Sequence, residues 1–235
     1  MTNLLFFVVV EMKRITFYEI EHAVDRATTG TTNNQVNDLY YASDVTDARP
    51  LFEKYQDIYY DFLPEDFGMD VFIGDPKAKR TDLLSTIFLG TNGFFVSQKF
   101  QEFIKSFNIS YFNYIPVYIK NLGENHEYKF LNLIRCPLLD FEKSEFEVKH
   151  RKNPENNYLI QLKSHEEFMS ENNKFSDYSI RIAVNKAVIK EAPDLFMYEI
   201  NGRKLISERL KNAIEQSDLK GIWIEPFDVE FFIED

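Results

Sequence analysis

The stretch FVSQKF at 95–100 continues to IPV at 115–117, and the stretch LISERL at 205–210 continues to EPF at 225–227. Matched positions in the two stretches are 110 residues apart, as Ser97 and Ser207 are, and no gap interrupts the match. Each copy holds an apolar pair, a serine, about three turns of helical pattern, and then an apolar strand that carries a proline. This internal repeat is more specific than any other motif in the chain, and our fold prediction rests on it.

The serine of each copy predicts the start of a helix. A serine hydroxyl at an N-cap accepts a hydrogen bond from a free backbone N–H of the first helical turn. Apolar residues follow both serines with the period of an amphipathic helix. We therefore predict that Ser97 and Ser207 cap two helices. The apolar stripes are Phe100, Phe103, Ile104 and Phe107 in the first copy, and Leu210, Ala213 and Ile214 in the second.

The prolines Pro116 and Pro226 restrict where the strand of each copy can lie. Proline has no backbone N–H to donate to a ladder, so it favours an edge strand, a strand start or a bulge. Each copy thus predicts a helix that leads into a strand at such a position. Two unrelated helices that each have a serine cap remain an alternative, because few matched positions are identical.

The remaining patterns are mostly those of strands. Ile180, Ile182 and Val184 alternate with polar residues, and Asn201-Gly202 is typical of a hairpin turn. We predict an α+β fold: a mixed, mostly antiparallel sheet with a few helices, which contains two related helix–strand units.

Four local expectations complete this prediction. Helical spacing indicates an amphipathic helix over 51–62, and the apolar run at 4–10 indicates a buried strand. The basic and polar segment at 150–157 predicts a surface turn. Trp223 is expected to be largely buried.

Composition limits the number of domains. The chain has 235 residues and 23 phenylalanines, enough for one large domain with a sizeable core. Residues 1–92 hold 15 acidic and 8 basic residues, a net charge of −7, whereas residues 93–235 hold 23 and 19, a net of −4. We predict an acidic N-terminal region, 1–92, packed on a main domain, 93–235, that contains the repeat.

The net charge of −11 indicates the kind of partner. Nucleic-acid binding depends on cationic contacts to phosphate, so this charge argues against a nucleic-acid partner. An acidic surface instead suits a basic protein, which it attracts during encounter. From Glu53 to Asp75 there are seven acids and one base, Lys54, and tyrosines there could anchor an interface. The candidate partner-binding residues are Asp57, Tyr59, Tyr60, Asp61, Glu65, Asp66 and Asp70. An ordinary solvated helix face is an equally good reading of this segment.

Catalytic and cofactor motifs are missing from the sequence. None of the four histidines has metal-ligand spacing from another or from Cys136, the single cysteine. There is no phosphate-binding glycine loop, no nucleophile elbow and no zinc-protease motif. We therefore predict a protein that is not an enzyme and that holds no metal or cofactor. A single cysteine and the lack of a membrane-length apolar run suit a cytoplasmic protein, which starts at Met1 or at Met12.

From Gly93 onward the chain resembles the eleventh immunity-protein family of bacterial polymorphic toxin systems, once a domain of unknown function. The resemblance covers roughly 140 residues and depends on the order and spacing of weak hydrophobic motifs. These motifs are GFFVS at 93–97 with Phe100, YIPV at 114–117, YKFLN at 128–132, DFEKS at 140–144, LF at 195–196, ISERL at 206–210 and GIWIEP at 221–226.

The resemblance implies a cytoplasmic protein that is encoded beside a toxin and neutralises it by binding. It does not identify the toxin. Ser97, Pro116, Ser207 and Pro226 are expected to be structural, as caps and strand ends, and are not carried over as a binding site. A small-molecule-binding or regulatory module is the alternative function, and an enzyme is the third.

Overall fold

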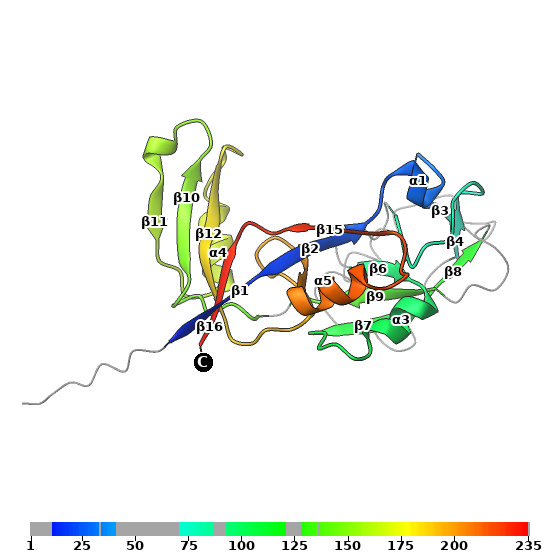
Figure 1. The fold of residues 1–235 in the computed structure, drawn as a ribbon. Coiled ribbons are helices and arrows are strands. Elements are labelled where there is room, and N and C mark those ends of the chain that lie inside the picture. Colours follow the sequence, from blue (N-terminus) through cyan, green and yellow to red (C-terminus); the bar gives the residue numbers. More distant parts are fainter. Residues whose placement is uncertain are drawn as a thin grey trace, which may run out of the picture. The chain divides into compact units, whose positions relative to one another are not determined.

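The computed structural model describes residues 11–32, 34–40, 71–86, 93–120, 128–135 and 137–234. These residues form an α+β fold in which most strand pairs are antiparallel, as predicted (Figure 1). The expected strand at 4–10 and helix at 51–62 lie outside the described residues, as does Cys136.

The chain forms two compact units, which are described one at a time. Unit 1 comprises residues 1–16, 138–192 and 228–235, and unit 2 comprises residues 17–137 and 193–227. Unit 2 continues through residue 92, where charge suggested a boundary. Because residues 41–70 and 87–92 lie outside the described part, the acidic N-terminal region stays a prediction.

Unit 1 contains one five-stranded sheet with the strand order β1-β16-β12-β10-β11. Its neighbouring strands are antiparallel, except that β12 and β16 run parallel. β12 alternates as its sequence predicts, with Ile182 and Val184 buried and Arg181 exposed. The strands are β1 Met12–Ile15, β10 Glu145–His150, β11 Tyr158–Ile160, β12 Ile180–Ile189 and β16 Glu230–Glu234.

Helix α4, His165–Asn172, packs against the unit 1 sheet through Phe168, whose ring lies 6.3 Å from that of Phe146. The helix start is fixed from both sides. Ser164 accepts a hydrogen bond from the backbone N–H of Glu167, and the Glu167 carboxylate accepts one from the N–H of Lys163 at 2.7 Å. A 3-10 turn, η2 (Pro154–Asn156), connects β10 to β11 within the predicted surface turn.

Unit 2 contains two four-stranded sheets of related design and a three-stranded sheet, β3-β4-β8. The first four-stranded sheet has the order β5-β6-β9-β7, and the second has the order β13-β14-β2-β15. The described strands of unit 2 are β2 Phe17–His22, β3 Val36–Tyr40, β4 Val71–Gly74, β5 Leu83–Leu84, β6 Gly93–Val96, β7 Phe112–Pro116, β8 Tyr118–Lys120, β9 Lys129–Leu133, β13 Leu195–Met197, β14 Lys204–Ser207 and β15 Ile222–Pro226. Its helices are α1 Arg26–Thr29, α3 Gln98–Ile104 and α5 Glu208–Glu215.

The two copies of the repeat have the same local structure, which confirms the predicted helix–strand units. Ser97 and Ser207 are N-caps with nearly equal backbone angles, φ −66° and ψ 161° against φ −68° and ψ 159°. Their hydroxyl oxygens accept from the N–H groups of Phe100 and Leu210 at 3.1 and 3.2 Å. Both following strands lie at a sheet edge and end on a proline, so the prolines interrupt no central ladder.

The third strand of each four-stranded sheet comes from outside the copy that it completes. β9 lies in sequence after β7 and fills the first sheet, whereas β2 lies before both copies and fills the second. The registers match: Phe130 of β9 faces Phe95 and Ile115, and Glu19 of β2 faces the corresponding Leu205 and Glu225. Figure 1 shows β2, in blue, beside β15, in red. A repeat unit can be defined as one strand followed by a β-β-α-β motif. By this definition β2 is the first strand of the first unit and β9 is the first strand of the second unit. Each of these strands lies in the sheet of the other unit, so the two units have exchanged their first strands.

Two buried aspartates connect the copies reciprocally. Asp82 accepts from the Ser97 hydroxyl at 2.6 Å and from the backbone N–H of Lys220, beyond the helix of the second copy, at 2.8 Å. Asp194 accepts from the Ser207 hydroxyl at 2.6 Å and from the backbone N–H of Asn108, beyond the helix of the first copy, at 2.9 Å. Each cap is therefore fixed to its own copy and to the other one.

Asp194→Asn is expected to reduce the dependence of stability on acid pH. Burial alone would raise the pKa of Asp194, but hydrogen bonds from Arg209, Ser207 and the Asn108 N–H hold it below its usual value. A lowered carboxyl pKa adds stability above the unfolded value of about 4, and this stability is lost as pH falls through the folded pKa. At pH 7 the variant should lose about 1.5–3 kcal/mol of unfolding free energy.

Urea unfolding at pH 7 and near pH 3 measures this effect. The unfolding free energy of the variant should fall less between the two pH values than that of the wild-type protein. An equal fall in both proteins would show that Asp194 does not contribute to acid sensitivity.

The core of unit 2 lies on both faces of the first four-stranded sheet. One cluster joins the two copies and contains Phe94, Phe100, Leu131, Ile206 and Leu210. The other cluster contains Phe95, Phe130 and Ile115 and packs them against Phe72 and Ile119 of the three-stranded sheet. The first sheet is thus covered on both sides.

Candidate functional site

The acidic residues predicted to bind a partner lie outside the described part of the chain. Asp57, Tyr59, Tyr60, Asp61, Glu65, Asp66 and Asp70 all fall within residues 41–70. They stay predictions. The four residues expected to be structural, Ser97, Pro116, Ser207 and Pro226, occupy caps and strand ends.

Side chains for metal binding do not cluster in the described ranges. Within them, no group of three or more histidine, cysteine, aspartate or glutamate side chains could hold a metal ion. His165 instead packs between the rings of Phe141 and Phe168. Burial lowers the pKa of His22, against the raising effect of Glu21. Among the described helices, none has the length and apolar character to cross a membrane.

Trp223 lies at the surface, so the expectation that it is buried was wrong. It is 53% exposed and is the second residue of the edge strand β15. Its neighbours Ile222 and Ile224 pack against the core cluster that joins the copies. Because side chains alternate along a strand, Trp223 and Glu225 point to the opposite face. The alternation could have predicted this, but the apolar character of tryptophan favoured the wrong answer.

The equivalent face of the first copy is covered. Asn113 and Ile115 are the counterparts of Trp223 and Glu225 in β7. Ile115 is 2% exposed because it packs in the cluster that includes the three-stranded sheet. Glu225, in contrast, is exposed. Asn113 itself is partly exposed, and on the face of Trp223 the central residues Leu205 and Glu19 are buried, so the exposed part of this face is the edge strand β15.

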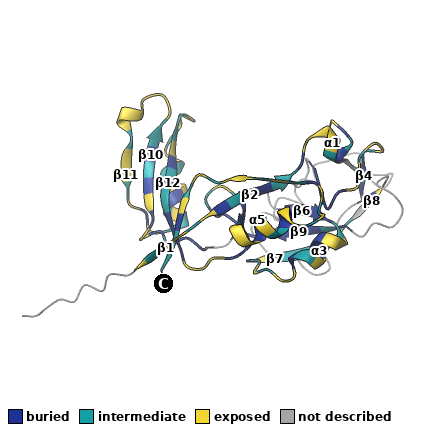
Figure 2. Cartoon of the chain, in the orientation of Figure 1, coloured by how far each residue is buried: buried dark blue, intermediate teal, exposed yellow. Residues whose placement is uncertain are grey.

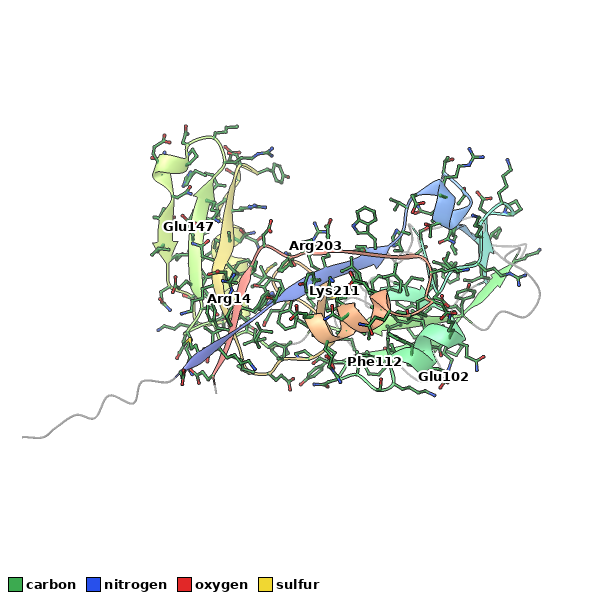
Figure 3. The ribbon with its side chains drawn as sticks, viewed as in Figure 1. Arg14, Glu102, Phe112, Glu147, Arg203 and Lys211 are labelled. Atoms are coloured by element: carbon green, nitrogen blue, oxygen red, sulfur yellow. The ribbon has the colours of Figure 1, made fainter. Side chains whose placement is uncertain are left out.

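Three carboxylates lie on the strands around Trp223, and two of them are paired with cations. Glu21 lies directly opposite Trp223 in the strand register, and it forms an ion pair with the buried Lys204 at 2.7 Å. Next to it, Glu19 pairs with Arg203 at 2.6 Å; Arg203 is labelled in Figure 3. Glu225 has no ion pair with any described residue. We call Glu21, Trp223 and Glu225 the Trp223 surface.

A second feature is a pocket of about 480 Å³ in unit 1, where β10 ends and β12 begins. Its lining includes Lys149, Arg151 and Arg181, together with Tyr178. Figure 2 shows exposed residues, in yellow, along the adjacent strand β11. The sequence indicated a basic turn at 150–157. It did not show that Arg181 of β12, and Tyr178 just before that strand, join that turn.

Comparison of the sequence with models of known protein families gave no match, and comparison with curated proteins gave none either.

Proposed function

We propose that this protein is a cytoplasmic immunity protein, which binds a cognate polymorphic toxin and neutralises it without catalysis. The proposal begins from the resemblance over 93–226. On this reading the partner is a protein with a basic surface, and no nucleic acid, membrane or cofactor takes part.

The observation that carries the proposal is the Trp223 surface. A large aromatic side chain that is half exposed on an edge strand is the kind of group that anchors protein interfaces. The carboxylate of Glu225, which has no ion pair with a described residue, complements a basic partner, as does the net charge of −11.

The direct test is co-expression with the toxin encoded beside this gene. Cells that make the toxin should survive when they also make this protein, and the purified proteins should form a stable complex. The complex should form without turnover of any substrate by this chain. Cell death despite co-expression, together with no complex between the purified proteins, would overturn the proposal.

Neutralising the predicted acidic site distinguishes electrostatic attraction, which changes the association rate, from direct contacts, which change the dissociation rate. The variant Asp61→Asn, Glu65→Gln, Asp66→Asn and Asp70→Asn should lower the association rate more than it raises the dissociation rate. Raising the salt concentration should weaken the same effect, because charges more than about 10 Å apart are screened at 0.1 M.

A matched control removes four exposed acids elsewhere: Glu142→Gln, Glu145→Gln, Glu155→Gln and Glu191→Gln. This control should change the association rate less than the acidic-site variant does. Equal changes would mean that net charge alone attracts the toxin. An unchanged association rate in the acidic-site variant would remove Glu53–Asp75 from the interface.

A further inference from the structure

We infer that the basic pocket of unit 1 binds a small phosphate ester that carries an aromatic ring, of the size of a nucleoside monophosphate. This inference goes beyond the proposed function, since a protein partner does not require the pocket. It depends on two arginines of the pocket lining that form no ion pair with a described residue, on an exposed aromatic side chain, and on the size of the pocket.

The cations come from two adjacent strands. Lys149 of β10 and Arg181 of β12 are directly opposite each other in the antiparallel register. Like charges directly opposite each other destabilise a strand pair; Glu147 lies 3.5 Å from Lys149, whereas Arg181 has no ion pair with a described residue. Arg151 follows β10, and its backbone N–H donates to the carbonyl of Ser179 at 2.8 Å, which fixes it beside the start of β12.

The nearby carboxylates, Glu147 and Asp177, bind residues other than the two arginines, and some of those residues line the pocket. Glu147 lies 3.5 Å from Lys149 and accepts from the Asn185 amide at 3.0 Å. Asp177 accepts from the backbone N–H of Ser179 at 2.8 Å and lies 4.0 Å from Lys152. Neither Arg151 nor Arg181 has an ion pair with a described residue. Two guanidinium groups are therefore available for the forked hydrogen bonds that a phosphate accepts.

Neutral donors and a rigid wall complete the phosphate end. Ser179 brings a hydroxyl to the pocket lining. Asn157 lies in the wall, where its Oδ1 accepts from the backbone N–H of His150 at 2.8 Å. A site that is fixed before the ligand arrives loses less conformational entropy on binding.

Tyr178 is the residue of the pocket lining that would stack on the aromatic ring of the ligand. Its relative exposure is 103%, so no described residue packs on its ring. Tyrosine beside arginine is a common platform on which a nucleobase stacks. A volume of about 480 Å³ lies in the range of small-molecule pockets, roughly 300–1,000 Å³. The net charge of −11 disfavours a long polyanion, so we assign the site to a free nucleotide.

The test is calorimetric titration of the full chain, at low ionic strength, with the four ribonucleoside monophosphates, their nucleosides and inorganic phosphate. At least one monophosphate should bind with one site per chain. Its nucleoside and inorganic phosphate should each bind at least about tenfold more weakly, because each lacks one of the two contacts. Absence of binding by all four monophosphates at millimolar concentration would overturn the inference.

Three variants assign the contacts. Arg151→Gln with Arg181→Gln should weaken monophosphate binding by at least about tenfold. The control Lys163→Gln with Lys174→Gln removes the same charge from exposed positions of unit 1 and should leave the affinity within about twofold. Tyr178→Ala should weaken the monophosphate by about tenfold while inorganic phosphate binds as before.

Two outcomes of these variants contradict the site. An equal loss in the control would mean that general charge attracts the ligand. An unchanged affinity in Tyr178→Ala would remove the stacking contact. A single-stranded oligonucleotide that binds more than about tenfold tighter than the monophosphate would also overturn the inference, because the site would then serve nucleic acid. All substituted side chains are exposed, so thermal unfolding should show folded variants.

Discussion

Phe100→Ala is expected to lower the unfolding free energy by about 3–5 kcal/mol, and Leu210→Ala by about 2–5 kcal/mol. Both side chains are 0% exposed and lie in the core cluster that joins the two copies of the repeat. Each is the first core residue after its capping serine, so each change leaves a cavity at the same place in its copy. The measurement is urea unfolding followed by circular dichroism.

Exposed positions of the same helices provide the control. Gln98→Ala in α3 and Asn212→Ala in α5 remove side chains that face solvent, and each should change stability by no more than about 0.5 kcal/mol. A loss below about 1 kcal/mol for Phe100→Ala or Leu210→Ala would show that the helix concerned is not anchored by that residue.

Trp223→Ala is expected to weaken toxin binding by about 2–4 kcal/mol, a factor of roughly 30 to 1,000 in affinity. The side chain is 53% exposed, so the stability of the free protein should change little. Leu159→Ala is the matched control, since Leu159 is an apolar side chain, 71% exposed, in unit 1. Its removal should leave the affinity unchanged.

Fluorescence gives a second readout of the same contact. Trp223 is the single tryptophan, so all tryptophan emission reports on this surface. The free protein should emit as a solvent-exposed indole does, and the emission should shift to the blue when the toxin covers it. Complex formation without such a shift, and with full affinity in Trp223→Ala, would place the interface elsewhere.

Sequence patterns predicted the features that depend on neighbouring residues. A serine cap and the apolar stripe behind it act within one helix, and a proline excludes itself from a central ladder wherever the strand lies. Ser97, Ser207, Pro116 and Pro226 therefore lie as predicted. The hairpin at Asn201-Gly202 formed for the same reason: Gly202 adopts φ 72°, which suits glycine.

Features that depend on distant residues could not be predicted from these patterns. The exchange of β2 and β9 depends on pairing between segments far apart in sequence. The alternation of apolar and polar residues within a strand does not identify the strand with which it pairs. Asp82 and Asp194 are 112 residues apart, two more than the serines that they bind, so an ungapped repeat does not align them. The pocket of unit 1 likewise joins a turn to a strand that begins more than twenty residues later.

The exchanged strand also sets an order of events during synthesis. β2 leaves the ribosome early, but its partners β14 and β15 are among the last strands to be made. At about 5–20 residues per second, β2 waits on the order of ten seconds or more with both edges unpaired. Unpaired apolar edges invite aggregation, and charged side chains within a strand oppose it. Glu19 and Glu21 alternate with Tyr18 and Ile20 along β2, so the charges of the two glutamates oppose aggregation of the nascent strand. Once Arg203 and Lys204 are synthesised, they form ion pairs with these glutamates and neutralise their charge.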